Sequence, residues 1–264
     1  MTHHQTDYSR YFSLRQKATL INMSEGRDMD YFESLSGYVV GRNSDKIDLH
    51  IPYYPVDNDQ ADLKQQKICY KLTTEALGNG IQVMTDLDNI VAGNIFQLKL
   101  RGNLELFQRR TSQRINTALK LINLKRDISF ILYKKEWKRI FDYIQAKGLP
   151  PNFILQNTTV SLSIGGIGIS MVETAEPSPL SIFILDIPDN QAPVCALAEA
   201  VWKKKDQEEL KCGHRFIQIL KSDQERIGNY VMSLQKQAGN IAGATKINWE
   251  LVDRMSVAQH ESKK

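Results

Sequence analysis

The first hundred residues consist of short segments in which apolar and polar residues alternate, separated by turn-forming residues. Apolar side chains at every second position are typical of strands that are buried on one face only. The expected strands are residues 17–23, 34–40, 47–51, 68–73, 81–85 and 95–100. Because the strands are short and no long helical pattern lies among them, this part of the chain predicts a small antiparallel barrel or sandwich.

A helical pattern follows in the second half of the chain. Trp137, Ile140, Phe141 and Ile144 are spaced as i, i+3, i+4 and i+7, so they lie on one face of a helix. Gly148 and the two prolines after it end the pattern, which predicts a helix over residues 136–147. We expect this helix to pack on a barrel, although its role could instead be to dock a partner.

A second helical pattern lies near the end of the chain. Ile227, Tyr230, Val231 and Leu234 repeat the same spacing. The tetrapeptide that begins at Ser222, with a glutamate three residues later, has the pattern of a capping box and predicts the start of this helix.

Further strands are expected between and beside the two helices, at residues 160–163, 168–172, 180–185, 194–201 and 213–219. The fold class is therefore predicted to be mainly β, with two small antiparallel β-barrels in tandem. The second barrel carries a helical insertion and a C-terminal helix. We expect residues 1–106 to form the N-terminal barrel, residues 107–237 the second barrel domain, and residues 238–264 a polar tail with a possible helix near Asn248.

Composition narrows the class of protein only slightly. The chain has 264 residues, 42% of them hydrophobic, which is enough for two modest cores. A net charge of +4 is too small to indicate a general nucleic-acid-binding protein. The three cysteines show neither a disulfide framework nor metal-ligand spacing. With no signal-peptide pattern and no apolar run of membrane length, these features predict a cytoplasmic protein.

Candidate chemistry begins with a basic segment at the expected domain junction, where Arg109, Arg110 and Arg114 lie close together. An arginine side chain can donate two parallel hydrogen bonds to O6 and N7 of guanine. The same planar group can also stack on a purine or bind phosphate. Arginine pairs at this spacing are common by chance, so the segment has little meaning alone.

A serine- and glycine-rich segment forms the second motif. Ser161 and Ser163 supply hydroxyl groups, and Gly165 and Gly166 allow a ligand to approach the backbone closely. Together, the two motifs indicate a site for a ligand with guanine bases and two phosphates. Nothing in them requires a catalytic base, a nucleophile, a metal or a cofactor, so we expect no enzyme activity. His214 is expected to be a strand residue and not a catalytic one.

The order of these motifs resembles the PilZ family of bacterial cyclic di-GMP receptors, in particular the two-domain type similar to flagellar-brake proteins. The family has an RxxxR motif at the domain junction, matched here by Arg110 and Arg114. It then has Asp or Asn followed by x-Ser-x-x-Gly, matched by residues 161–166, and a Gly-x-x-Phe strand, matched by Gly213 and Phe216. The resemblance covers about residues 105–237, and the N-terminal barrel is PilZ-N-like in architecture only.

This resemblance implies a cytoplasmic receptor in second-messenger signalling that binds cyclic di-GMP at the domain junction and changes its domain arrangement. It further implies a downstream protein partner, a role in motility or biofilm regulation, and a monomer or homodimer without nucleic acid. The implied ligand-binding residues are Arg109, Arg110, Arg114, Ser161, Ser163, Gly165 and Gly166.

Ser161 departs from the family pattern, because the family has Asp or Asn at this position. Serine accepts hydrogen bonds more weakly and over a shorter reach. The alternative function is therefore a PilZ-like protein-interaction module whose nucleotide binding is weak, lost or altered toward another cyclic dinucleotide. A barrel that binds single-stranded nucleic acid would need exposed aromatic residues beside the arginines, and Phe107 alone is too little.

Overall fold

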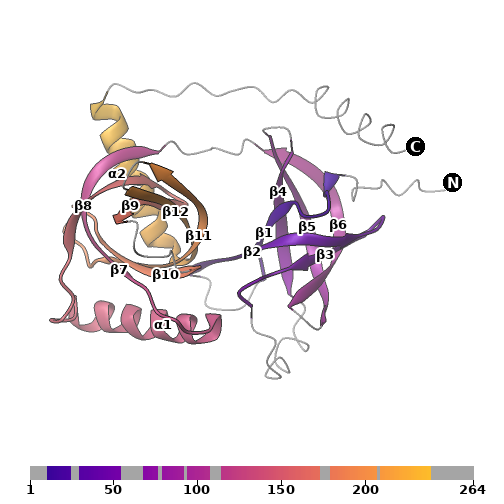
Figure 1. The fold of residues 1–264 in the computed structure, drawn as a ribbon, viewed down its shortest axis with the longest axis horizontal. Helices are drawn as coiled ribbons and strands as arrows, with labels where there is room; N and C mark the ends of the chain where they lie inside the picture. The colour runs from indigo at the N-terminus through magenta and orange to yellow at the C-terminus, as the bar shows by residue number, and fades with distance from the viewer. Residues whose placement is uncertain are drawn as a thin grey trace. The chain divides into compact units, whose positions relative to one another are not determined.

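The computed structural model describes residues 11–24, 30–54, 68–76, 79–91, 94–107, 114–172, 179–206 and 209–238, and these residues form two compact units (Figure 1). The first unit contains the described residues from 11 to 107 except 30–33. The second unit contains residues 30–33 together with those from 114 to 238. The inclusion of residues 30–33 in the second unit was not expected from the strand pattern.

The first unit is a closed antiparallel barrel. Its strands are β1 (Lys17–Asn22), β2 (Tyr31–Arg42), β3 (Lys46–His50), β4 (Cys69–Ala76), β5 (Asn79–Val91) and β6 (Ile95–Phe107). The strands pair in the order β1–β4–β5–β6–β3–β2, and β2 pairs with β1 to close the circuit. Leu20, Leu49, Leu72 and Phe96 are buried inside it. The alternating segments of the sequence thus form the predicted strands, because each strand has one face in the core.

The second unit contains another closed six-stranded barrel. It is made of β7 (Ile115–Leu124), β8 (Gln156–Ser163), β9 (Gly166–Val172), β10 (Leu180–Asp186), β11 (Val194–Asp206) and β12 (Glu209–Leu220). The pairing runs β7–β8–β9–β12–β11–β10, and β10 pairs with β7. The predicted fold class, two antiparallel barrels in tandem, is confirmed.

Strand β7 was not predicted, although its inward side chains alternate. Ile115, Leu119 and Leu121 pack in or against the barrel core, and the residues between them are more exposed. Thr117 and Ala118 weaken the contrast between the two faces, so the periodicity is hard to recognise from the sequence. The strand also begins directly after the arginine segment, and this part of the sequence was interpreted as a junction between domains.

The helical insertion α1 (Phe130–Lys147) packs on strands β10 and β11. Trp137 is fully buried, and its Nε1 donates a hydrogen bond to the carbonyl oxygen of Cys195, 3.0 Å away. Tyr31, at the start of β2, packs edge-on against the rings of Trp137 and Phe141. The expectation that this helix packs on a barrel is confirmed.

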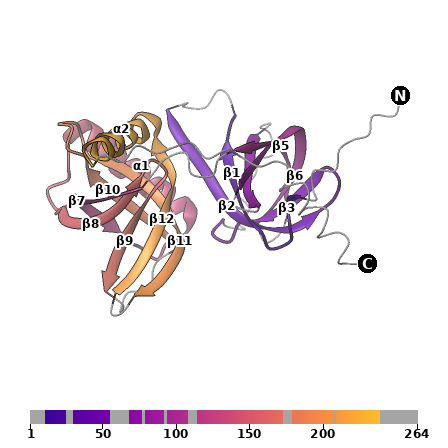
Figure 2. The same ribbon diagram turned by 90° about the horizontal axis from the view of Figure 1, so that it is seen from above.

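The C-terminal helix α2 (Lys221–Gln237) closes one end of the second barrel (Figure 2). Ile227 and Val231 are buried in the same core as the barrel strands. The predicted capping box is wrong, because the N-cap residue is Leu220 and no side chain caps the helix. Strand β12 runs into α2 without a loop, which places Ser222 inside the first helical turn.

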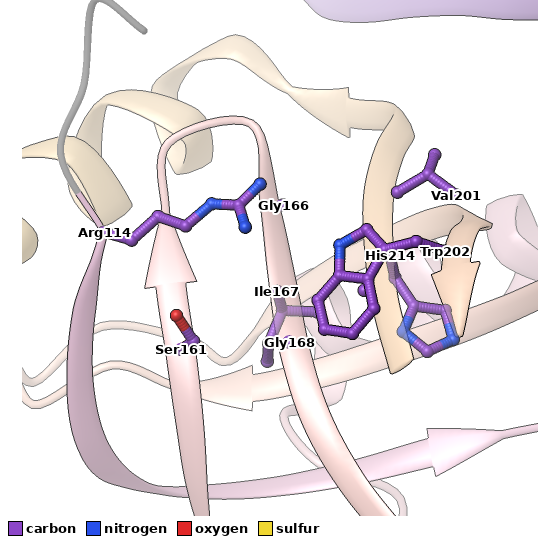
Figure 3. A pocket seen from close by; sticks show the side chains of 9 residues that line it. Arg114, Ser161, Gly166, Ile167, Gly168, Val201, Trp202 and His214 are labelled. Carbon is purple, nitrogen blue, oxygen red and sulfur yellow. The ribbon is translucent and has the colours of Figure 1, made fainter. Parts of the chain in front are cut away.

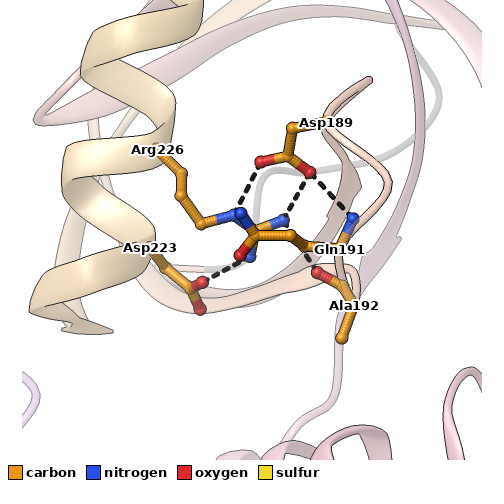
Figure 4. A network of polar contacts seen from close by, with 5 residues as sticks. All are labelled: Asp189, Gln191, Ala192, Asp223 and Arg226. Atoms are coloured by element: carbon orange, nitrogen blue, oxygen red, sulfur yellow. Dashed lines mark hydrogen bonds and ion pairs between the residues drawn. The ribbon is translucent and has the colours of Figure 1, made fainter.

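Helix α2 is joined to the β10–β11 connection by Arg226 (Figure 4). Its guanidinium donates to both carboxylate oxygens of Asp189, at 2.8 and 2.9 Å, and to the carbonyl oxygen of Ala192 at 3.0 Å. It also donates to Asp223 at 2.6 Å. The hydrogen bonds from Arg226 lower the pKa of Asp189, whereas burial raises the pKa of Asp223. A charged side chain of α2 is thus bonded to two groups of the β10–β11 connection and to Asp223 of its own helix.

Candidate functional site

The turn between β8 and β9 is held tightly against strand β12. Ser163 pairs with Gly166, and its hydroxyl donates to the Gly166 carbonyl oxygen at 3.2 Å. The amide of Phe216 donates to the carbonyl oxygen of Gly165 at 3.0 Å. A Cβ atom on Gly166 would collide with the carbonyl oxygen of His214. Gly166 is therefore required by the packing of the backbone itself, whereas Gly165 is exposed and faces open space.

Ser161 lies two residues before Ser163 on the outward face of β8, since Val160 and Leu162 point into the core. Its cross-strand neighbours are Asn116 on β7 and Gly168 on β9. A Cβ atom on Gly168 would stand 3.3 Å from the Cβ of Ser161, which is tighter than an ordinary contact. The missing side chain of Gly168 thus leaves the surface beside the Ser161 hydroxyl uncovered.

An exposed tryptophan stands on the same face. Trp202 on β11 is 42% exposed, and its indole lies directly on Gly213 of β12, where any Cβ atom would collide with it. Trp202 and Gly213 line a depression together with Arg114, Ser161, Gly166 and Gly168. Figure 3 shows the guanidinium of Arg114 extending from the start of β7 toward the side that carries the indole.

This depression is small. Its volume is about 10 Å³, which is close to the space that a single water molecule needs. A ligand of nucleotide size would therefore lie on this outer face of the barrel and not inside it.

The structure brings together some of the residues that the motifs singled out. Arg114, Ser161 and Gly166 line the depression, and Ser163 and Gly165 belong to the turn beside it. Arg109 and Arg110 lie outside the described residues, so their part in the site stays a prediction.

Sequence reasoning did not assign Trp202 to the site. The available signal was a tryptophan at the end of a strand, followed directly by three lysines, where a core residue is not expected. Gly213 was recognised only as part of a strand motif. Gly213 also leaves room for the indole of Trp202, and this contact arises only because β11 pairs with β12.

Residues 108–233 match the family model of the PilZ domain. The chain carries a PilZ domain. The matched segment begins just before the described part of the second unit and ends within α2, so it includes the whole barrel and the depression. No curated protein matches this sequence.

Several solved structures resemble the chain over most of its length. An inhibitor of motility from Bacillus subtilis (MotI/DgrA) is 13% identical, with coverage of 86% of this chain and 99% of that one and a TM-score of 0.35. YcgR from Escherichia coli, solved with c-di-GMP, is 15% identical over 84% of this chain and 85% of that one, with a TM-score of 0.33. MrkH from K. pneumonia, also in a c-di-GMP complex, is 12% identical over 85% and 89%, with a TM-score of 0.30. All three TM-scores are low, so the family assignment depends on the sequence match of the PilZ domain.

In the described part of the chain, no helix is both long and apolar enough to cross a membrane. Within the same residues, no three His, Cys, Asp or Glu side chains are grouped so that they could hold a metal ion.

Proposed function

We propose that this protein is a receptor for cyclic di-GMP, which binds on the outer face of the PilZ domain and changes the arrangement of the two units to regulate a downstream protein. The observation that carries the proposal is the convergence of Arg114, Ser161 and Trp202 around a glycine-lined depression. These residues come from three different strands or strand ends, and they offer a cation, a hydroxyl and an aromatic face on one surface.

Each of these groups matches one part of the ligand. The exposed guanidinium of Arg114 can donate paired hydrogen bonds to a guanine edge or bind a phosphate. The exposed indole of Trp202 can stack on a purine face, since stacking on an aromatic side chain contributes about 1–3 kcal/mol per base. Gly168 leaves the strand between them without a side chain, so a flat base can approach the backbone.

The depression covers only a small part of such a ligand, so the remaining contacts must come from elsewhere. Arg109 and Arg110 precede Arg114 closely in the chain, and we propose that they bind the ligand from the side opposite Ser161, Ser163, Gly165 and Gly166. This arrangement would couple ligand binding to the connection between the two units.

Calorimetric titration with cyclic di-GMP tests the site. Arg110→Ala and Arg114→Ala should each weaken binding by roughly tenfold to a hundredfold, because a hydrogen bond to a charged group contributes about 1.5–3 kcal/mol. Arg139→Ala is the matched control, since Arg139 is exposed on α1 and bonds Glu136 of the same helix. Unchanged affinity in both Arg110→Ala and Arg114→Ala would show that the site is misassigned.

Ser161 favours a second candidate function, a PilZ-like interaction module with weak, lost or altered nucleotide binding. Thermal unfolding with cyclic di-GMP and with other cyclic dinucleotides separates the two functions. A ligand at 100 times its dissociation constant stabilises the folded protein by about 2.7 kcal/mol. Stabilisation by cyclic di-GMP supports the receptor. No stabilisation by any cyclic dinucleotide supports the interaction module.

A further inference from the structure

The second barrel has two different ends. One end is closed by α2, as described above, and it includes the start of β7 and the ends of β8, β10 and β12. The opposite end, here called the hairpin end, is where β7 and β9 finish and where β10 and β12 begin. In Figure 2 the β11–β12 hairpin extends away from α2 at this end.

Polar side chains inside the hairpin end are buried without hydrogen-bond partners among the described residues. The hydroxyl of Ser181, a fully buried residue, has none, and neither do the two ring nitrogens of His214, which is 3% exposed. The side-chain oxygen of Asn123 is also buried and unpaired. Leaving such buried groups unsatisfied is unfavourable. The Ser181 hydroxyl and a His214 ring N–H can both donate to a bound polar species, whereas the Asn123 oxygen can only accept.

Strand register brings these three residues to the same interior surface. Asn123 of β7 pairs with Phe183 of β10, and the His214 ring packs edge-on against the Phe183 ring with centroids 5.0 Å apart. Ser181 is two residues before Phe183 on the same strand, so its side chain points to the same face.

Two lysines supply positive charge at the same end. Lys125 directly follows Leu124, which pairs with Ile182, so Lys125 comes beside Ser181. Its Nζ atom donates to the sulfur of Met171 at 2.9 Å, and a thioether is a weak acceptor for an ammonium group. Lys203 of β11 pairs with Cys212 of β12, and both lysines act electrostatically on the Cys212 thiol.

We propose that the hairpin end of the PilZ barrel binds a small anion, a phosphate or a carboxylate, between the ammonium groups of Lys125 and Lys203. The hydroxyl of Ser181 and one ring N–H of His214 would donate hydrogen bonds to it. His214 also lines the depression of the proposed nucleotide site, whereas Lys125 and Lys203 do not. Variants of these two lysines therefore test the anion site separately from the nucleotide site.

The same residues do not favour a metal ion. His214, Cys212 and Met171 are possible soft ligands, but two ammonium groups near them would repel a cation. Burial also raises the pKa of the Cys212 thiol, which keeps it in the protonated form that does not ligate metals.

The protonation of His214 provides a direct measure of anion binding. Burial, assisted by the charge of Lys125, lowers the pKa of His214 to about 4. Cys212 lies two residues away on its own strand, and Lys203 of β11 acts on that thiol. The residues that pair or pack with His214 on β9, β10 and β11 are the neutral Ile167, Phe183 and Ala200. A bound anion stabilises the protonated imidazole, so it should raise this pKa toward the ordinary value.

The experiment is a nuclear magnetic resonance titration of the full chain labelled with ¹⁵N-histidine, with inorganic phosphate in one arm and succinate in the other. His214→Asn identifies the His214 signals. We expect saturable shifts of these signals with at least one probe, together with a rise in the His214 pKa. Whichever probe binds more tightly identifies the chemical class of the anion.

Lys125→Met should weaken this binding by about tenfold or more, since it removes a charged donor. Lys120→Met is the matched control, because Lys120 is exposed on the outward face of β7, the strand that Lys125 directly follows. Lys203→Met, at an exposed position of β11, should weaken binding as well. The affinity for cyclic di-GMP should be unchanged in Lys125→Met. The experiment can therefore reject the anion site without rejecting the proposed receptor function, on which it does not depend.

Two results would overturn the proposal. One is the absence of any saturable His214 shift with both probes, which would mean that internal water alone solvates these groups. The other is equal anion affinity in the wild-type protein and in a Lys125→Met, Lys203→Met double variant, which would place the anion elsewhere.

Discussion

At the scale of single residues, Ser161 is the position of the proposed site where this chain departs from the PilZ pattern. It lies on the outward face of β8 beside the bare backbone of Gly168, so a longer side chain could extend over that glycine without meeting another side chain. A serine hydroxyl reaches less far than the amide or carboxylate that the family has there. We therefore expect Ser161 to make a weaker contact with the proposed ligand than an asparagine would make at the same position.

Ser161→Asn is expected to strengthen cyclic di-GMP binding by up to about tenfold, because a neutral hydrogen bond contributes about 0.5–1.5 kcal/mol. Calorimetric titration measures the change, and Ser161→Ala is the control that should weaken binding further. Equal affinities in the asparagine variant and the wild-type protein would show that Ser161 does not limit binding.

At the scale of elements, the attachment of α2 combines apolar packing with one charged side chain. Ile227 and Val231 enter the barrel core, and Arg226, whose side chain is 13% exposed, bridges Asp189 and Asp223. Asp223 is 3% exposed, so it depends on Arg226 for the compensation of its charge. The loss of one member of such a buried group leaves the others uncompensated.

Arg226→Met should therefore lower the free energy of unfolding by about 3 kcal/mol. Urea denaturation at neutral pH measures this change, with Arg139→Met as a control of the same chemistry on the exposed face of α1, where a change below about 0.5 kcal/mol is expected. If the free energy of unfolding fell by the same small amount in both variants, the Arg226 network would contribute no more to stability than a surface ion pair does.

At the scale of the whole molecule, each barrel has its own closed circuit of strands and its own core. One of the segments that connect them includes Arg109 and Arg110, which the ligand is proposed to bind; another is β2, whose residues 31–33 belong to the second unit. A ligand on this connection can therefore alter the arrangement of the units without unfolding either barrel.

Small-angle X-ray scattering should show that a saturating amount of cyclic di-GMP changes the distribution of interatomic distances of the chain. Arg114→Ala at the same nucleotide concentration should show a smaller change, because its weaker binding leaves more of the protein without ligand. Calorimetric binding without any change in scattering would leave the receptor function in place and remove the domain rearrangement from the proposal.

How well the sequence predicted the structure also depends on the scale of the feature. The strands of the first barrel were predicted from alternation, and the face of α1 that packs on β10 and β11 was predicted from its i, i+3, i+4 spacing. The prediction of a capping box at Ser222 was wrong because β12 continues directly into α2, so the helix begins before Ser222. Trp202 was missed because its importance depends on a glycine eleven residues away in the neighbouring strand.

The sequence by itself determined the mainly β class, both helices and the motif residues, because side-chain periodicity and short motifs are properties of neighbouring residues. Only the tertiary structure decided which of these residues meet. Closure of the second barrel places Arg114 and Ser161 on one face with Trp202, and it turns Lys125 and His214 toward the same interior end. Such neighbours come from strands far apart in the chain, and their pairing follows from the register of the closed sheet.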